Sequence, residues 1–217
     1  MIDRLRGILL FLPVPLVLWL FLAHPLGVPR SLALGVVLMA THRLYARPFA
    51  LSRATRRCLW CGRPVGEGPI LVLEEPGGTT TWRCCGATHE TALRRLLGRA
   101  ARWRLFLRAG ILGTLAAFLV LAIPAERGLL GPFTFDDAAA LFRLGIALTV
   151  LPLGWLGVLL GPREAGRLRP PFPVHVQALV GTWAVLWLFR LVGLWWLLLG
   201  TTHVLRRAGV DLPAFLP

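Results

Sequence analysis

Apolar and polar residues follow one another along this chain in long blocks. Residues 7–23 (GILLFLPVPLVLWLFLA) carry no charge, and residues 26–41 are mostly apolar after a Pro/Gly turn. About 20 apolar residues in a helix cross the ~30 Å hydrocarbon core of a bilayer. The first run therefore predicts a membrane span, although its basic start also fits a signal peptide. The second run is short for a span, so an interfacial or re-entrant segment is the alternative.

Three further apolar runs fill the second half of the chain: Leu105–Pro124, Phe142–Gly161 and Ala178–Gly200. Hydrophobic residues make up 56% of the 217 positions, which is too apolar for a soluble domain of this size. The pattern predicts a mainly α-helical, multi-pass membrane protein with about five transmembrane helices.

The stretch between the two apolar blocks is polar. Residues 42–104 hold twelve arginines and all four cysteines of the chain. A region of about sixty residues has a marginal hydrophobic core, which a bound metal commonly completes. We therefore predict an N-terminal transmembrane hairpin (1–42), an inserted α+β module (43–104) and a C-terminal block of about three helices (105–217).

The charge pattern predicts which side of the membrane each part faces. The chain has 24 arginines, no lysine and 10 acidic residues, for a formal charge of +14. Arginine-rich loops stay in the cytoplasm, so the module is predicted to be cytoplasmic and the C-terminus outside. Arg206 and Arg207 conflict with this assignment, because they would lie outside. Whether residues 178–200 cross the whole membrane therefore stays open. Arginine as the only strong base indicates a GC-rich coding sequence, and hence a bacterial inner membrane.

The module begins with a motif typical of metal sites. Cys58 and Cys61 form a C-x2-C-G turn, in which two thiolates can point at one centre. Two β-prone runs follow, at 70–75 and 79–84, and the Pro-Gly-Gly sequence between them predicts a hairpin.

A second pair of metal-binding side chains follows the hairpin. Cys85 follows the second predicted strand, and Thr88 can cap a helix whose first turn presents His89. These two residues are one helical turn apart, so both can reach a metal held by the first pair. Four protein ligands leave no open coordination position, which makes the predicted Zn²⁺ site structural.

The order of knuckle, hairpin and ligand-bearing helix resembles the treble-clef family of zinc fingers over residues 58–104. The resemblance implies that Cys58 and Cys61 are the knuckle ligands and that Cys85 and His89 are the ligands at the helix start. Cys84 departs from the family pattern and is the alternative to Cys85. Treble clefs serve protein or nucleic-acid recognition as well as scaffolding, so the resemblance implies a metal and not an activity.

A redox dithiol at Cys58 and Cys61 is the rival interpretation. Redox C-x2-C motifs start a helix in a βαβ setting, whereas Pro64 follows here. Disulfides also persist outside the cytoplasm, opposite to the predicted side of the module. Thiol exchange is therefore the less favoured alternative.

Arg190 lies near the middle of an apolar run, where a charge costs at least ~2.5 kcal/mol. Such a residue marks a functional site by default, with Asp136, Asp137, a backbone carbonyl or a substrate anion as its partner. This interpretation predicts a small transporter or membrane enzyme with a site around Arg190 and Asp137. The alternative is that the segment tilts and Arg190 snorkels to the interface.

A basic face is expected on the helix after His89, formed by Arg94, Arg95, Arg99 and Arg102. Beside a membrane entry, such a face favours anionic lipid headgroups over nucleic acid, and no nucleic-acid recognition motif accompanies it.

The sequence favours no catalytic chemistry. His42, His175 and His203 stand singly at segment ends and do not favour haem, and no hydrolase or nucleotide-binding motif occurs. A non-enzymatic membrane scaffold or interaction protein is therefore favoured. A protein partner on the zinc module and oligomerisation stay open.

Overall fold

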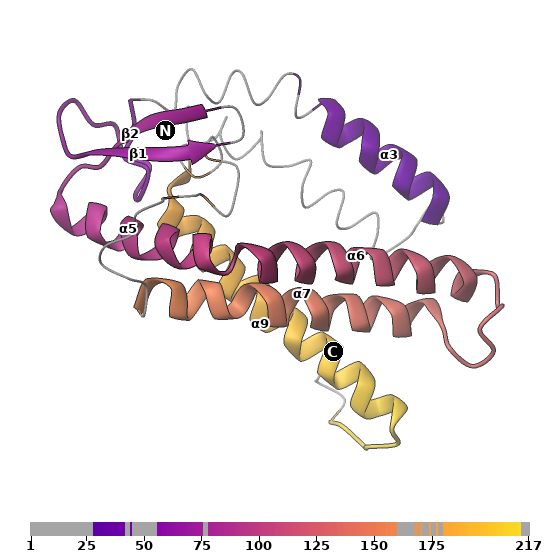
Figure 1. The fold of residues 1–217 in the computed structure, drawn as a ribbon. Helices are drawn as coiled ribbons and strands as arrows, with labels where there is room; N and C mark the ends of the chain where they lie inside the picture. Colours follow the sequence, from indigo (N-terminus) through magenta and orange to yellow (C-terminus); the bar gives the residue numbers. More distant parts are fainter. Residues whose placement is uncertain are drawn as a thin grey trace.

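The fold is mainly helical, with one two-stranded sheet (Figure 1). The computed structural model describes residues 28–41, 44, 56–75, 78–159, 168, 170, 174, 177 and 180–213 of the chain. The first predicted span, residues 7–23, lies outside these residues.

Three helices in the described ranges are long and apolar enough to cross a bilayer: α6 (Arg104–Glu126), α7 (Phe135–Leu159) and α9 (Thr182–Arg207). They contain 23, 25 and 26 residues, which corresponds to about 34–39 Å at a rise of 1.5 Å per residue. They cover the third, fourth and fifth predicted segments. Helix α7 begins at Phe135 rather than Phe142, and α9 continues to Arg207 rather than ending at Gly200.

Helix α3 (Val28–Thr41) covers the second predicted segment. Its 14 residues reach about 21 Å, short of the ~30 Å hydrocarbon core. The helix contacts α6, and most of its described side chains are exposed. The described residues therefore support three spans, and the expectation of about five has no support among them.

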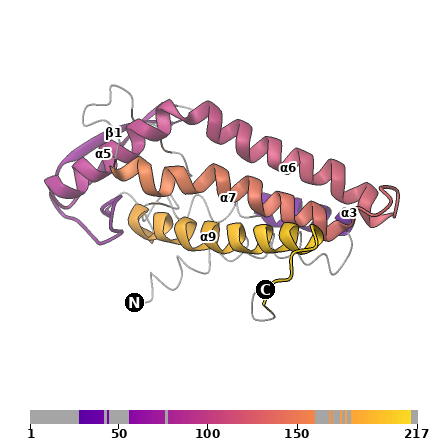
Figure 2. The same ribbon diagram turned by 90° about the horizontal axis from the view of Figure 1, so that it is seen from below.

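Helix α7 is the central element of the membrane block. It packs against α6 on one side and against α9 on the other, as the second view shows (Figure 2). Two small-residue contacts bring α6 and α7 close together: Gly110 lies against Thr149, and Gly145 lies against Thr114. Membrane helices commonly associate through such small residues, because they let the backbones approach each other.

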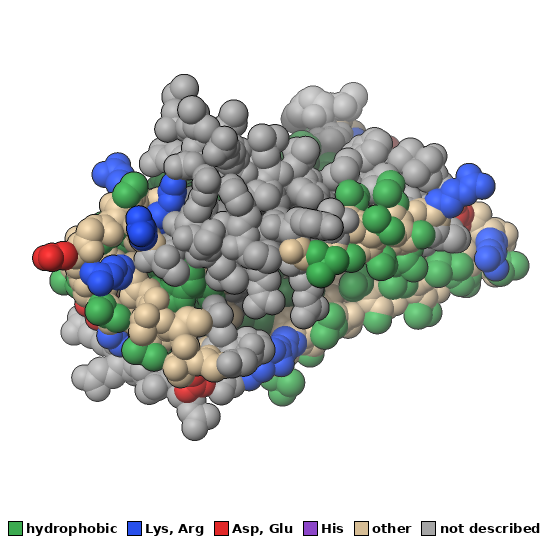
Figure 3. All heavy atoms as spheres, turned by 90° about the horizontal axis from the view of Figure 1, so that it is seen from above, with side chains coloured by type: hydrophobic (Ala, Val, Ile, Leu, Met, Phe, Trp, Pro, Cys, Tyr) green, Lys and Arg blue, Asp and Glu red, His purple; other side chains and the backbone are tan. Residues whose placement is uncertain are grey.

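Aromatic rings fill the end of the block farthest from the hairpin. Phe118 of α6 packs edge-to-face on Phe135, with ring centroids 5.8 Å apart, and lies 5.0 Å from Phe142. Trp196 of α9 lies 5.9 Å from Phe142, so the cluster joins all three spans. Many large apolar side chains elsewhere on these helices are exposed, and Figure 3 shows hydrophobic side chains gathered over the right-hand half of one face. That distribution is typical of a lipid-facing surface.

The hairpin consists of strands β1 (Ile70–Glu75) and β2 (Gly78–Arg83), paired antiparallel with Leu71 opposite Trp82. Leu71, Leu73 and Trp82 are buried, while Ile70 and Val72 on the other face are exposed. The strands alternate as a half-buried sheet should, and the predicted hairpin is confirmed.

Helix α5 (Ala87–Arg102) packs its apolar face into the core and leads directly to α6. The predicted apolar positions are buried or partly buried: Ala92, Leu93, Leu96, Leu97, Ala100 and Trp103. The expected cap at Thr88 is wrong. The helix begins at Ala87, because the Glu90 N–H donates to the carbonyl of Gly86 at 3.1 Å, and no side chain caps this end.

One hydrophobic core runs from the hairpin into the membrane block. Leu107, Leu153 and Leu186 of the three spans lie in the same buried cluster as the hairpin and α5. Leu168 and Val174, from the segment between α7 and α9, also belong to it. The module and the start of α9 are therefore packed together.

Candidate metal centre

The first two cysteines are held in a closed backbone turn. The Cys58 N–H donates to the carbonyl of Arg63 at 2.8 Å, and the Gly62 N–H donates to the carbonyl of Cys58 at 2.7 Å. Gly62 has a φ of +70°, a left-handed conformation that glycine adopts without strain. We call residues 58–62 the knuckle.

The second pair lies where the hairpin meets α5. Cys85 lies two residues after the end of β2, and His89 stands in the first turn of α5. The knuckle is attached to the end of β2, because Cys58 bridges to Arg83 and the Leu59 N–H donates to the Arg83 carbonyl at 3.0 Å. This attachment brings the two pairs together.

The four side chains form one cluster with the dimensions of a zinc site. Their ligand atoms all lie within 4.8 Å of one another. Cys61 Sγ is 3.7 Å from Cys85 Sγ, and His89 Nδ1 is 3.7 Å from Cys58 Sγ and 2.9 Å from Cys85 Sγ. Ligands around a tetrahedral zinc ion, at about 2.3 Å for sulfur, lie roughly 3.6–3.8 Å apart; the two 3.7 Å separations match this range, whereas Cys85 and His89 lie closer together. A Cys3His group of this geometry can hold a metal ion.

The cluster stabilises a thiolate at Cys58. Burial raises the pKa of this thiol, but hydrogen bonds from the amides of Cys61 and Cys85 and from the His89 ring outweigh burial, and the net pKa falls to about 6. Cys58 is therefore deprotonated at neutral pH, the form in which a cysteine binds metal.

Cys84 is not part of the cluster. It is completely buried in the hydrophobic core, and burial together with the nearby charges of Cys58 and Glu90 raises its pKa to about 12. A neutral, buried thiol is an inert core residue. Of the two adjacent cysteines, Cys85 is the one that the structure brings to the other three ligands.

The knuckle also binds the start of α9, a contact that the sequence did not predict. Thr182 donates to the carbonyl of Leu59 from its N–H at 3.0 Å and from its hydroxyl at 2.7 Å. The Trp183 N–H donates to the carbonyl of Trp60 at 3.0 Å. The first N–H groups of a helix have no partner within that helix. The two residues between Cys58 and Cys61 supply those partners.

Two glycines allow this contact. A Cβ on Gly181 would lie 2.7 Å from the carbonyl carbon of Cys61, and one on Gly62 would lie 3.0 Å from the N atom of Gly181. Both have positive φ, +95° at Gly181 and +70° at Gly62. Only the Gly-Thr pair before an apolar run hints at this in the sequence, since Gly and Thr are common at helix starts.

Arg190 binds a backbone carbonyl, one of the partners expected for it. Its Nε and Nη2 donate to the carbonyl of Gly154 in α7, at 2.9 and 2.7 Å. The guanidinium lies 4.5 Å from the ring centre of Trp155 and 4.8 Å from that of Trp187. A cation near the C-terminal end of a helix is favoured by the helix dipole, and exposed tryptophans gather at membrane interfaces. Arg190 therefore joins α9 to the last turns of α7, beside two tryptophan rings.

Asp137 lies at the other end of α7. Thr134 and Asp137 form a reciprocal capping box: the Thr134 N–H donates to Asp137 Oδ2 at 2.7 Å, and the Asp137 N–H donates to Thr134 Oγ1 at 3.4 Å. His203 Nε2 lies 2.7 Å from Asp137 Oδ1, and Arg207 donates to both carboxylate oxygens, at 3.0 and 2.8 Å. Arg207 also donates to the carbonyl of Pro132.

The structure therefore does not bring Arg190 and Asp137 together. Arg190 contacts Gly154, which is about 25 Å along α7 from Asp137. The sequence missed His203 and Arg207 as partners of Asp137, because their separation by more than 60 residues gives no local signal. His42 and His175 lie outside the described residues.

Comparison with protein-family models, with curated proteins and with solved structures gave no match to this chain.

Proposed function

We propose that this chain is a non-enzymatic membrane scaffold whose treble-clef-like module holds one structural Zn²⁺ and thereby fixes the start of α9. The observation that carries the proposal is the pair of backbone bonds from Thr182 and Trp183 to Leu59 and Trp60. The two acceptor residues stand between two candidate metal ligands, so the ion that orders the knuckle also orders the cap of a membrane helix.

Metal energetics support a structural role. A small zinc module gains its folding free energy from the ion, and four protein ligands exclude substrate from the coordination sphere. Residues 58–75 and 78–103 would then form a rigid body packed on α7 and α9. Such a body suits a docking platform for a protein partner at the membrane.

The surroundings of the module fit anionic lipid. Arg94, Arg95, Arg99 and Arg102 lie on α5, which leads straight into α6. Basic residues next to a membrane entry attract anionic headgroups. Because the module is rich in arginine, we propose that it lies on the cytoplasmic side of a bacterial inner membrane. Nucleic acid is the less favoured partner.

The proposal is tested on the full chain, purified in mild detergent. We expect one zinc per chain by elemental analysis. Removing the ion with a chelator should speed deuterium exchange at the first turn of α9 (182–185) as well as at the knuckle, because the cap loses its support. Exchange in the middle of α7 should not change.

Two adjacent cysteines provide matched variants. Cys85→Ser should lose the zinc, since a hydroxyl is a poor zinc ligand. Cys84→Ala should retain it, although the small cavity lowers stability slightly. Zinc retained in Cys85→Ser and lost in Cys84→Ala would overturn the ligand assignment, and a chain purified without metal would overturn the proposed function.

A further inference from the structure

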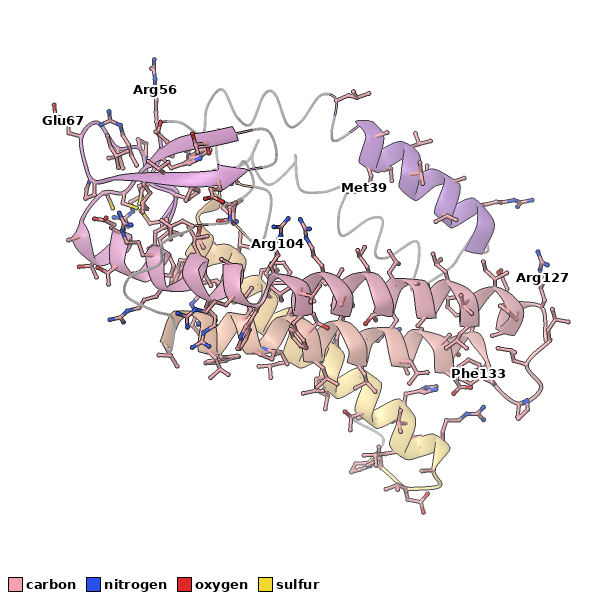
Figure 4. All side chains as sticks on the ribbon, in the orientation of Figure 1. Met39, Arg56, Glu67, Arg104, Arg127 and Phe133 are labelled. Atoms are coloured by element: carbon pink, nitrogen blue, oxygen red, sulfur yellow. The ribbon has the colours of Figure 1, made fainter. Side chains whose placement is uncertain are left out.

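The metal cluster has an inner and an outer side. Cys58 is completely buried, Cys61 and His89 are half-buried, and Cys85 is exposed. Figure 4 shows the sulfur atoms between the hairpin and the start of α5, at the end of the molecule where Arg56 and Glu67 point away from it. A small solute therefore meets Cys85 first and Cys61 next.

These two outer sulfurs are close enough to bond after a small shift. Cys61 Sγ and Cys85 Sγ lie 3.7 Å apart, and a disulfide needs about 2.05 Å. They stand on different segments, the knuckle and the end of β2, so a bond between them would close a loop across the module. The inner Cys58 and the core residue Cys84 are both shielded from solvent.

We propose that Cys61 and Cys85 form an oxidation site at which a hydroperoxide, such as hydrogen peroxide, makes a disulfide and releases the metal. The inference rests on the proposed function, since it gives the regulation of the same zinc site. It differs from a Cys58–Cys61 redox dithiol, because the sulfurs are paired across the module rather than within the C-x2-C turn.

The chemistry balances with peroxide as the only oxidant. As a metal ligand, Cys85 would be held as the thiolate; its sulfur attacks one peroxide oxygen, the O–O bond breaks, and hydroxide leaves to give a sulfenic acid. The thiolate of Cys61 attacks that sulfur, the S–O bond breaks, and a second hydroxide leaves as the S–S bond forms. Two electrons pass from the sulfurs to peroxide, two protons convert the hydroxides to water, and the metal departs as the divalent cation, because two of its four ligands are gone.

The same bond would disturb the cap of α9. The backbone of Cys61 lies directly against Gly181, where even a Cβ would meet it at 2.7 Å. Closing the sulfur gap by about 1.7 Å would pull the Cys61 sulfur, and with it the knuckle backbone, towards Cys85. The carbonyls of Leu59 and Trp60 then lose their position on the first N–H groups of α9. Oxidation at the exposed edge would thereby loosen the start of a membrane span.

The test uses the zinc-loaded full chain in lipid nanodiscs, treated with hydrogen peroxide. We expect one zinc released per chain, a Cys61–Cys85 disulfide in the peptide map, and deuterium exchange about tenfold faster over the first turn of α9. Reduction with dithiothreitol followed by zinc should restore the ion and the protection. Cys84→Ala keeps both outer thiols and should behave like the wild-type chain.

Several results would overturn the inference while leaving the proposed function intact. These are zinc retained at peroxide levels that oxidise free cysteine, a disulfide that joins Cys58 to Cys61, or sulfinic acid without a disulfide. If the disulfide forms but exchange at residues 182–185 stays slow, the coupling to α9 is wrong. A chain purified without zinc contradicts the proposed function instead, and peroxide treatment of that chain then tests the disulfide alone.

Discussion

At the residue scale, two charges in apolar helices act as ties between α7 and α9. Arg190 donates to the carbonyl of Gly154 near one end of α7, and Asp137 accepts from His203 and Arg207 at the other end. The helix dipole of α7 favours both contacts, because the cation lies near its C-terminal end and the carboxylate lies in its first turn. Intramembrane charges mark function by default, but here they also explain how two helices keep their register.

Two substitutions can distinguish the specific contacts of Asp137 from a general effect of removing one negative charge. Asp137→Asn should destabilise the protein by about 2 kcal/mol, less than a fully buried pair because Arg207 is half exposed. The expected result is a lower midpoint of thermal unfolding in detergent. Asp136→Asn is the matched control: this neighbouring carboxylate is exposed and attracts Arg143, so its loss should lower the midpoint much less. Equal effects of the two variants would argue against the tie.

The tie also explains an irregularity in the charge pattern. Arg206 and Arg207 stand on the predicted outer side, where arginine is disfavoured. Arg207 is neutralised locally by Asp137, so it adds little to the positive charge of that side. The charge pattern alone could not reveal a partner 70 residues away.

At the element scale, the helices pack where side chains are smallest. Gly110 and Gly145 each face a threonine of the neighbouring helix across the α6–α7 contact, and added Cβ atoms would lie 2.6 Å from the threonine hydroxyls. Close-packed interiors resist added volume. The sequence contains many glycines in its apolar runs, and only the packing distinguishes those at a helix contact from those facing outward.

This distinction gives a paired substitution. Gly145→Leu should destabilise the α6–α7 contact by about 2 kcal/mol through overpacking against Thr114. Gly113→Leu lies on the exposed side of α6, with no neighbour within 4 Å, and should be tolerated. Size-exclusion chromatography after stepwise heating would measure both. A Gly113→Leu variant as unstable as Gly145→Leu would contradict this packing.

The contact between knuckle and helix gives a second pair. Gly181→Ala should lower stability and zinc retention, because its Cβ meets backbone atoms of Cys61 and Gly62 and because alanine is strained at positive φ. Gly209→Ala carries similar strain at a φ of +82° but has open space around it.

The difference in zinc retention between these two variants reports the effect of the backbone contact between Gly181 and the knuckle. We expect Gly181→Ala to lose zinc to a competing chelator faster than Gly209→Ala, whose loss should match the wild-type chain. Identical rates for both would mean that the contact does not support the metal site.

At the scale of the whole molecule, the module that carries the Cys3His cluster shares one core with three helices that are long and apolar enough to span a membrane. Three crossings after the module would place it and the C-terminal end of α9 on opposite faces of the bilayer. Glu67 on the module and Arg127 at the turn after α6 lie at opposite ends of the molecule (Figure 4).

This topology predicts a labelling pattern. With a membrane-impermeant maleimide, Glu67→Cys should react only in inverted membrane vesicles, and Arg127→Cys and Gly209→Cys only in intact cells. The unsubstituted chain measures the background from the native cysteines. Reaction of Glu67→Cys and Gly209→Cys from the same face would contradict three crossings.

The sequence by itself determined the local features of this protein. Apolar blocks predicted the three long helices, because length and hydropathy alone decide whether a helix can cross a bilayer. Spacing predicted the hairpin and the four residues of the metal cluster, because ligands three or four positions apart converge through local turns. Periodicity also predicted the buried face of α5.

Only the tertiary structure decided what depends on residues far apart in the chain. It selected Cys85 over Cys84, since burial of one of two adjacent thiols depends on the surrounding core. It gave Arg190 and Asp137 their separate partners, and it placed the first N–H groups of α9 on the knuckle. The acceptors in that last contact are backbone carbonyls, which every residue carries. No side-chain pattern could have revealed them.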